Sequence, residues 1–144
     1  MPAESSRPLL PELRPALFID KDGTLVENVP YNVDPARLKF MPGALEALRH
    51  IARWDFALVL VTNQSGLARG YFGRAQLDAL LRALAQRLWD EAGIRLQDVQ
   101  VCPHAPGAGG RPACLCRKPA PGMLVRAARL HGLDLLRSWM VGDT

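Results

Sequence analysis

The stretch Ala-Leu-Phe-Ile-Asp-Lys-Asp-Gly-Thr at residues 16–24 sets a pattern that the rest of this chain follows. Four apolar residues in a row are typical of a buried strand, and this strand ends in the polar Asp20. Side chains two residues apart on an extended segment point to the same side, so we expect Asp20 and Asp22 to face together and Lys21 to face away. Gly23 permits a sharp turn after them. The stretch therefore predicts a buried strand that ends in a pair of carboxylates.

Short apolar runs alternate with helical patterns along the whole sequence. Strands are predicted at residues 16–20, 56–62, 98–102 and 138–142, and helices at residues 43–53, 74–92 and 121–131. In the longest helix, leucines at helical spacing form one apolar face. Strand and helix in strict alternation predict an α/β fold, a Rossmann-like parallel sheet with helices on both faces. The one stretch expected to lack regular structure is residues 103–119.

The composition is that of one globular domain. The 144 residues are 49% hydrophobic and 22% charged, which is enough apolar material for a buried core. We expect residues 1–14, rich in proline and serine, to form a disordered leader, and residues 15–144 to form the domain. The longest apolar run, residues 56–61, is too short to span a bilayer, so we expect a cytoplasmic protein without a membrane partner.

The charge balance is mildly basic, with a net charge of +4. The eighteen Lys and Arg residues are scattered along the chain, so a nucleic-acid-binding stripe is not indicated. A positive field attracts anions and suits an enzyme whose substrate carries phosphate, although a solvated surface with spare arginines explains the excess equally well.

Polar side chains follow three of the predicted strands: Asp20, the pair Thr62-Asn63, and Asp143. The carboxyl ends of parallel strands meet at one crevice, where ligands bind in open α/β sheets. Two carboxylates side by side favour a cation, and hard oxygen ligands suit Mg²⁺. A carboxylate can also attack phosphorus while a second one serves as general acid and then base. Asp-x-Asp-Gly alone is equally consistent with a polar turn.

Three further motifs shift that balance towards phosphoryl transfer. Thr-Asn-Gln-Ser-Gly at residues 62–66 offers hydroxyl and amide donors for a phosphoryl oxygen. Arg117 and Lys118 supply cations that can neutralise charge on a transferring phosphoryl group. Asp143, after Val-Gly, is a candidate magnesium ligand. Each motif alone could be a turn or a solvated basic pair, but their order along one α/β scaffold favours an enzyme.

All three cysteines lie within residues 102–116. Cys102, His104, Cys114 and Cys116 provide four nitrogen and sulfur ligands, the set that a structural Zn²⁺ site needs. The alternative is three free thiols and a surface histidine. This zinc loop has almost no apolar residues of its own, so a bound metal would order it and hold Arg117 and Lys118 beside the crevice.

The four motifs resemble the signature motifs of the haloacid dehalogenase superfamily, the aspartate-nucleophile phosphatases, from Leu17 to the last residue. The resemblance implies that Asp20 is the nucleophile and a magnesium ligand. It implies that Asp22 is the acid/base catalyst, with its backbone carbonyl on the metal. Thr62 and Lys118 would steady the phosphoryl group, and Asp143 would complete the magnesium ligands.

The zinc loop, running into Arg-Lys-Pro, resembles two groups within that superfamily. One removes the 7-phosphate from D-glycero-D-manno-heptose 1,7-bisphosphate, and the other hydrolyses histidinol phosphate. Residues 62–70, Thr-Asn-Gln-Ser-Gly-Leu-Ala-Arg-Gly, are more similar to the first group. That likeness implies a small phosphorylated sugar as substrate, a role in lipopolysaccharide biosynthesis and a monomeric enzyme. The implied substrate contacts are Asn28, Val29, Pro30, Tyr31, Thr62, Asn63, Gln64, Ser65, Arg117 and Lys118.

Two points of the resemblance stay open at the level of sequence. Arg69 is a candidate for a second phosphate, or a solvated loop residue. The superfamily's fourth motif continues with a further acidic residue, a strand and a helix, whereas the sequence stops at Thr144. We therefore expect a domain without its C-terminal strand and helix, and a third reading is a truncated zinc-binding domain with impaired catalysis.

Overall fold

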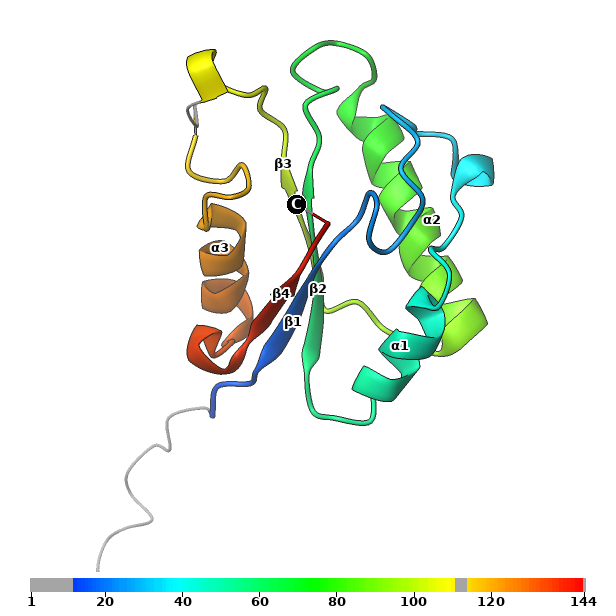
Figure 1. Cartoon of the computed structure of the whole chain (residues 1–144), viewed down its shortest axis with the longest axis vertical. Helices are drawn as coiled ribbons and strands as arrows, with labels where there is room; N and C mark the ends of the chain where they lie inside the picture. The colour runs from blue at the N-terminus through cyan, green and yellow to red at the C-terminus, as the bar shows by residue number, and fades with distance from the viewer. Residues whose placement is uncertain (1–11, 111–113, 144) are drawn as a thin grey trace, which may run out of the picture.

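A four-stranded parallel sheet forms the centre of the computed structural model, which describes residues 12–110 and 114–143 (Figure 1). The strand order is β3-β2-β1-β4, and each neighbouring pair is parallel. Parallel neighbours need crossover connections, and helices supply two of them here. The predicted α/β fold is confirmed. The strands are β1 (Ala16–Asp20), β2 (Ala57–Asn63), β3 (Asp98–Cys102) and β4 (Trp139–Val141).

Helices cover both faces of the sheet, as the sequence predicts. Figure 1 shows α1 (Ala44–Ile51) and α2 (Arg74–Ala92) on one side and α3 (Gly122–His131) on the other. Leu17 and Ile19 of β1 belong to the core cluster that includes α2. Phe18 belongs to the second cluster, with Met123 of α3. Because β1 is buried on both faces, its sequence is continuously apolar rather than alternating.

The boundaries of the elements follow from local chemistry. α1 starts after Gly43, whose positive φ of 80° is incompatible with a right-handed helix. β4 is shorter than the predicted strand at 138–142 because Ser138 has another role: its hydroxyl accepts a hydrogen bond from the Ala16 N–H at 2.9 Å. Three short 3₁₀ helices complete the described elements: η2 (Pro35–Arg37), η3 (Ala108–Gly110) and η4 (Leu135–Arg137).

The contacts of the domain, which the sequence predicts to start at residue 15, reach back to Arg14. Residues 1–11 lie outside the described part of the chain, but Arg14 belongs to the fold. Its N–H donates to Gly132 O at 3.1 Å, and the Asp134 N–H donates to Arg14 O at 2.7 Å. Its guanidinium pairs with Asp55. Ordered contacts therefore begin before residue 15. Within the described residues, no helix is long and apolar enough to cross a membrane.

Candidate active site

The strand ends that the sequence singles out meet at one pocket. This pocket, of about 330 Å³, lies at the carboxyl ends of β1, β2 and β4. A parallel sheet brings these ends together because neighbouring strands run in the same direction. The residues that line the pocket are Asp20, Asp22, Asn63, Lys118, Pro119, Met140 and Gly142.

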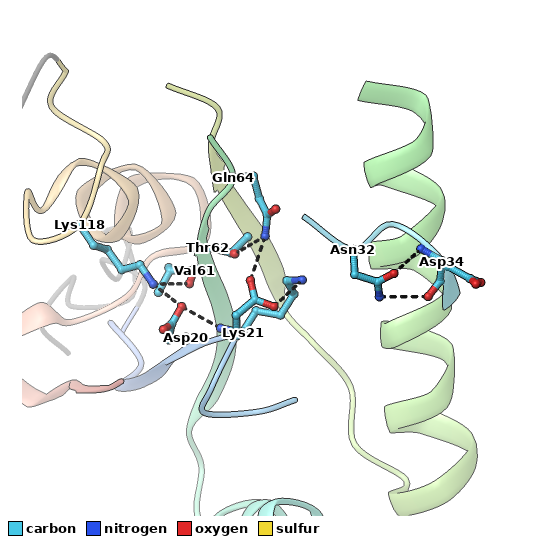
Figure 2. A network of polar contacts seen from close by, with 9 residues as sticks. Asp20, Lys21, Asn32, Asp34, Val61, Thr62, Gln64 and Lys118 are labelled. Carbon is cyan, nitrogen blue, oxygen red and sulfur yellow. Dashed lines mark hydrogen bonds and ion pairs between the residues drawn. The ribbon is translucent and has the colours of Figure 1, made fainter. Parts of the chain in front are cut away.

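Asp20 and Lys118 form the ion pair at the centre of the pocket (Figure 2). Both side chains are mostly buried, at 13% and 19% exposure. The Lys118 ammonium also donates to Val61 O at 3.1 Å, and the Lys21 N–H donates to the Asp20 carboxylate at 2.9 Å. Burial raises the pKa of Asp20 above its usual value, while the ion pair with Lys118 opposes this rise and contact with Asp143 adds to it. Asp20 is thus a shielded carboxylate next to a fixed cation.

Asp143 brings a second carboxylate against Asp20. It lies over Gly23, where a Cβ atom would collide with the Asp143 carboxylate, so only glycine leaves room for it. Gly23 also has a φ of 80°, which glycine adopts most readily. Two carboxylates in contact repel unless a proton or a cation lies between them. Their oxygen atoms are the hard donors that Mg²⁺ prefers, so this pair fits a magnesium ion.

Asp22 also lines the pocket, and two other residues hold its carboxylate. Its Oδ1 pairs with the Lys21 ammonium at 2.9 Å, and its Oδ2 accepts a hydrogen bond from Gln64 at 3.3 Å. Among the described residues, the one group of three or more metal-ligating side chains is the cysteine and histidine cluster, not the three aspartates.

The expectation that Lys21 faces away from Asp22 is wrong. Lys21 is buried, with 2% exposure, and its side chain contacts Asp22 directly. Strand alternation applies only as far as Asp20, where β1 ends. The chain then turns so that the N–H groups of Leu25 and Val26 both donate to Lys21 O at 3.0 Å. Inside such a turn the backbone is not extended, so successive side chains no longer alternate between two opposite sides.

The last two residues of β2 contact the other site residues. Thr62 is buried, with 1% exposure, and accepts a hydrogen bond from Gln64 at 2.8 Å. The Asn63 amide spans the backbone of Lys118: it accepts from the N–H at 3.0 Å and donates to the carbonyl at 3.4 Å. This contact ties the end of β2 to the loop that carries Lys118. Sequence patterns alone offered no signal for either pairing.

The remaining predicted substrate residues lie outside the lining of this pocket. Tyr31 has a positive φ of 55° and packs edge-on against Tyr71, with ring centroids 4.7 Å apart. Ser65 is half-buried and Arg69 is exposed. Asn28 and Pro30 are exposed and Val29 is half-buried.

The four predicted zinc ligands come together. Their ligand atoms all lie within 4.8 Å of one another. Sγ of Cys102 is 3.0 Å from Sγ of Cys116 and 3.6 Å from Sγ of Cys114, and Nδ1 of His104 is 3.2 Å from Sγ of Cys116. Tetrahedral zinc with sulfur at about 2.3 Å would separate its sulfur atoms by about 3.8 Å, so this cluster is close to the required size. The donor set and its spacing fit a structural Zn²⁺.

Burial and the neighbouring thiols raise the pKa of Cys116 to about 12. Without a metal, the cluster therefore retains a proton at neutral pH, which a metal ion must displace on binding. Arg117 belongs to the same loop: its N–H donates to Cys114 Sγ at 3.4 Å, and its guanidinium donates to His104 O at 3.3 Å. The cluster thus holds the residue immediately before Lys118.

Comparison with known proteins places this geometry among phosphatases. A family model described as "HAD-hyrolase-like" matches residues 115–144. The D-glycero-beta-D-manno-heptose-1,7-bisphosphate 7-phosphatase of Escherichia coli K12 is 40% identical over 132 residues, covering 90% of this chain and 69% of that protein.

Two solved structures have the same fold over most of this chain. A HAD-like phosphatase from Mesorhizobium loti has a TM-score of 0.83 and 39% identity, covering 96% of this chain and 68% of that one. The D,D-heptose 1,7-bisphosphate phosphatase from B. bronchiseptica, complexed with magnesium and phosphate, has a TM-score of 0.76 and 36% identity. It covers 90% of this chain, and the match covers 70% of that one.

Proposed function

This chain belongs to the family of D-glycero-beta-D-manno-heptose-1,7-bisphosphate 7-phosphatases, within the haloacid dehalogenase superfamily, and we propose that it removes the 7-phosphate from that sugar bisphosphate. The observation that carries the proposal is the shielded Asp20 carboxylate, which lies at the end of β1 against Lys118 and Asp143. A nucleophile for phosphorus needs a fixed position and a neighbouring cation, and Asp20 has both.

In the proposed reaction, a carboxylate oxygen of Asp20 attacks phosphorus and the bond between phosphorus and the sugar oxygen breaks. Asp22 gives a proton to the departing oxygen, and an aspartyl-phosphate remains on Asp20. Water then attacks the phosphorus while Asp22 takes a proton from it. The bond between phosphorus and the Asp20 oxygen breaks, inorganic phosphate leaves, and Asp20 returns to its carboxylate form. Lys118 offsets the negative charge on the phosphoryl oxygens, and Thr62 holds one of them.

Magnesium would be held by the carboxylates of Asp20 and Asp143 and by the backbone carbonyl of Asp22. When bound, it supplies positive charge against the phosphoryl oxygens. The two carboxylates in contact support this assignment, because a cation between them would offset their repulsion. Zinc would be held by Cys102, His104, Cys114 and Cys116, and its role would be structural, because four protein ligands leave no open position.

The substrate contacts remain part of the proposal. Residues 28–31 and 62–65, with Arg117 and Lys118, would surround the sugar and its phosphates, and Arg69 would be a further cation near its rim. The family membership supports a single small phosphorylated sugar as partner. The proposal also includes a monomeric cytoplasmic enzyme that acts in lipopolysaccharide biosynthesis, without nucleic-acid or membrane partners.

A phosphate-release assay tests the proposed function. The chain is loaded with Mg²⁺ and given D-glycero-D-manno-heptose 1,7-bisphosphate or histidinol phosphate, each over a range of concentrations. We expect kcat/KM to be higher for the sugar bisphosphate. Faster hydrolysis of histidinol phosphate would reject the substrate assignment, and no magnesium-dependent hydrolysis of either would favour the catalytically impaired domain.

A further inference from the structure

We propose that Gln64 is a positioning residue for Asp22: its side-chain amide orients the carboxylate that carries protons to and from the reacting oxygen atoms. This inference rests on the proposed function, because it concerns proton transfer in that reaction. Gln64 does not line the pocket that holds Asp20 and Asp22. Of residues 62–65, Gln64 would serve the substrate through Asp22 rather than by direct contact.

The first observation is the arrangement of the Gln64 amide (Figure 2). Its nitrogen carries two hydrogens, and the structure gives each an acceptor: Asp22 Oδ2 at 3.3 Å and Thr62 Oγ1 at 2.8 Å. Both bonds leave from the amide nitrogen, so the donor side of the amide faces Asp22 and Thr62. Both acceptors belong to the proposed catalytic set.

The second observation is that Gln64 itself is held in place. It is buried, with 6% exposure. Its backbone N–H donates to Cys102 O at 2.8 Å, which anchors it to the end of β3. A side chain that is fixed at its backbone and bonded at its tip can transmit its position to a neighbour. An exposed glutamine, which exchanges freely with water, would not.

The third observation is that Asp22 is held on both oxygens. Lys21 holds Oδ1, and Gln64 holds Oδ2. With both oxygens held, the plane of the carboxylate is fixed. If only one oxygen were held, the carboxylate could still rotate and its second oxygen would move. A carboxylate has about four acceptor positions, so these two contacts leave room for the proton that it transfers. Proton transfer requires a heavy-atom separation of about 2.6–3.2 Å, which depends on that plane.

The contact of Lys21 with Asp22 has an explanation apart from catalysis, and the contact of Gln64 with Asp22 has less of one. Lys21 is a buried charge and needs a carboxylate partner for its own stability, whatever the chemistry. Gln64 is neutral and gains no charge compensation from Asp22. A purely structural role for it would consist in satisfying its own amide, and the test must separate that role from positioning.

Two substrates with different leaving groups distinguish a positioning role of Gln64 from a purely structural one. A sugar phosphate releases an alkoxide-like oxygen that needs a proton, whereas p-nitrophenyl phosphate releases a stable phenolate that does not. Because kcat/KM covers only the steps up to departure of the leaving group, it reports the acid role of Asp22 and not its later role as base. Misorientation of Asp22 should therefore lower kcat/KM for the sugar phosphate selectively.

The experiment compares Gln64→Met and Gln64→Glu with the unaltered chain, on both substrates and with saturating Mg²⁺. Methionine keeps the length of the side chain and removes both donors. Glutamate keeps the shape and places a negative charge against Asp22. For both variants we expect kcat/KM to fall by about tenfold for the sugar bisphosphate and by less than about threefold for p-nitrophenyl phosphate. A complete general-acid role contributes about 10²–10⁴-fold to the rate, and misorientation should cost only part of it.

Gln100→Met is the matched control. Gln100 is also buried, with 8% exposure, and its amide also donates to an aspartate, Asp98, at 2.6 Å. It lies on β3 outside the proposed catalytic set, so both substrates should be hydrolysed within about twofold of the parent rate. Thr62→Val tests the other acceptor of Gln64. It should slow both substrates alike, because the phosphoryl oxygens are common to them.

Equal losses on both substrates, or no loss, in the two Gln64 variants would overturn the inference. Asp22→Asn, measured alongside, separates that result from failure of the proposed function. If Asp22→Asn affects the sugar bisphosphate selectively and the Gln64 variants do not, only the positioning role is wrong. If Asp22→Asn shows no selectivity, the acid role of Asp22 fails and the inference with it.

Discussion

The candidate active site and the cysteine cluster are assembled in opposite ways. The pocket takes its residues from distant segments: Asp20 ends β1, Asn63 ends β2, Lys118 comes from a loop, and Gly142 follows β4. The four ligands of the cluster come from residues 102–116, a single short stretch. The sheet holds the pocket together, whereas only Cys102 of the cluster belongs to the sheet, at the end of β3.

The two regions differ in the interactions that stabilise their folded structure. Behind the pocket, Phe18, Val59 and Val61 are buried in one apolar cluster, so hydrophobic burial fixes the strand ends whether or not a metal is bound. In the loop, Cys102 belongs to that apolar cluster and Cys114 and Cys116 pack against it, and a bound metal would add to the order that these contacts give. Lys118 belongs to both regions, because it follows Arg117 of the loop and pairs with Asp20 of the pocket. The dependence of activity on the loop should therefore pass through Lys118.

The largest effect is expected from Asp20→Asn. If Asp20 is the nucleophile, turnover should fall by about 10³-fold or more, while the melting temperature and zinc content stay near those of the parent. Asp55→Asn is the control, since Asp55 is 86% exposed and makes only a surface ion pair. Phosphate release and thermal melting are measured for both. An Asp20→Asn enzyme with parental activity would show that the pocket does not act through this residue.

Cys114→Ser should show how much the pocket depends on the loop. Loss of one ligand should release zinc and displace Lys118, and a displacement of about 1 Å can lower kcat by about 10²-fold. Elemental analysis should find about one zinc per chain in the parent and less in the variant. Chelation of the parent followed by addition of Zn²⁺ is the control, and activity should return. A zinc-free protein with full activity would mean that the sheet alone positions Lys118.

Arg117→Ala decides to which region Arg117 belongs. If its guanidinium binds a second phosphate, the lost charged hydrogen bond of about 2 kcal/mol should lower kcat/KM for the bisphosphate by about 30-fold. A small monoester should lose much less. In the structure the guanidinium bonds to His104 O, which favours a supporting role in the loop, and that role predicts equal losses on both substrates. Arg129→Ala, an exposed residue of α3, controls for the change of charge.

Asn63→Ala should have the smallest effect. It removes the two hydrogen bonds that join the end of β2 to the backbone of Lys118. Only the 3.0 Å bond from the Lys118 N–H has an ordinary length, and one neutral hydrogen bond of about 1 kcal/mol corresponds to about fivefold in kcat. Gln86→Ala, which removes an exposed hydrogen bond on α2, should leave kcat unchanged. A loss as large as that of Cys114→Ser would show that Asn63 and the metal loop position Lys118 to the same extent.

The predictions from sequence were accurate where one physical rule dominates. Leu77, Leu80 and Leu84 are buried as their helical spacing predicts, because an amphipathic helix has one apolar face. The strand ends meet in one pocket because parallel strands share a direction. The prediction for Lys21 was wrong because it extended strand geometry by one residue beyond the strand.

By itself, the sequence determined the parallel sheet, the edge at which the polar residues gather, and the four ligands of the cluster. Those features depend on periodicity and on residue type, which are local properties. Tertiary structure alone decided that Asn63 supports Lys118, that Gln64 and Lys21 share Asp22, and that Gly23 makes room for Asp143. These pairs join segments that are separated along the chain or cross a tight turn. No periodicity relates such residues, and only the packed fold brings their atoms within bonding distance.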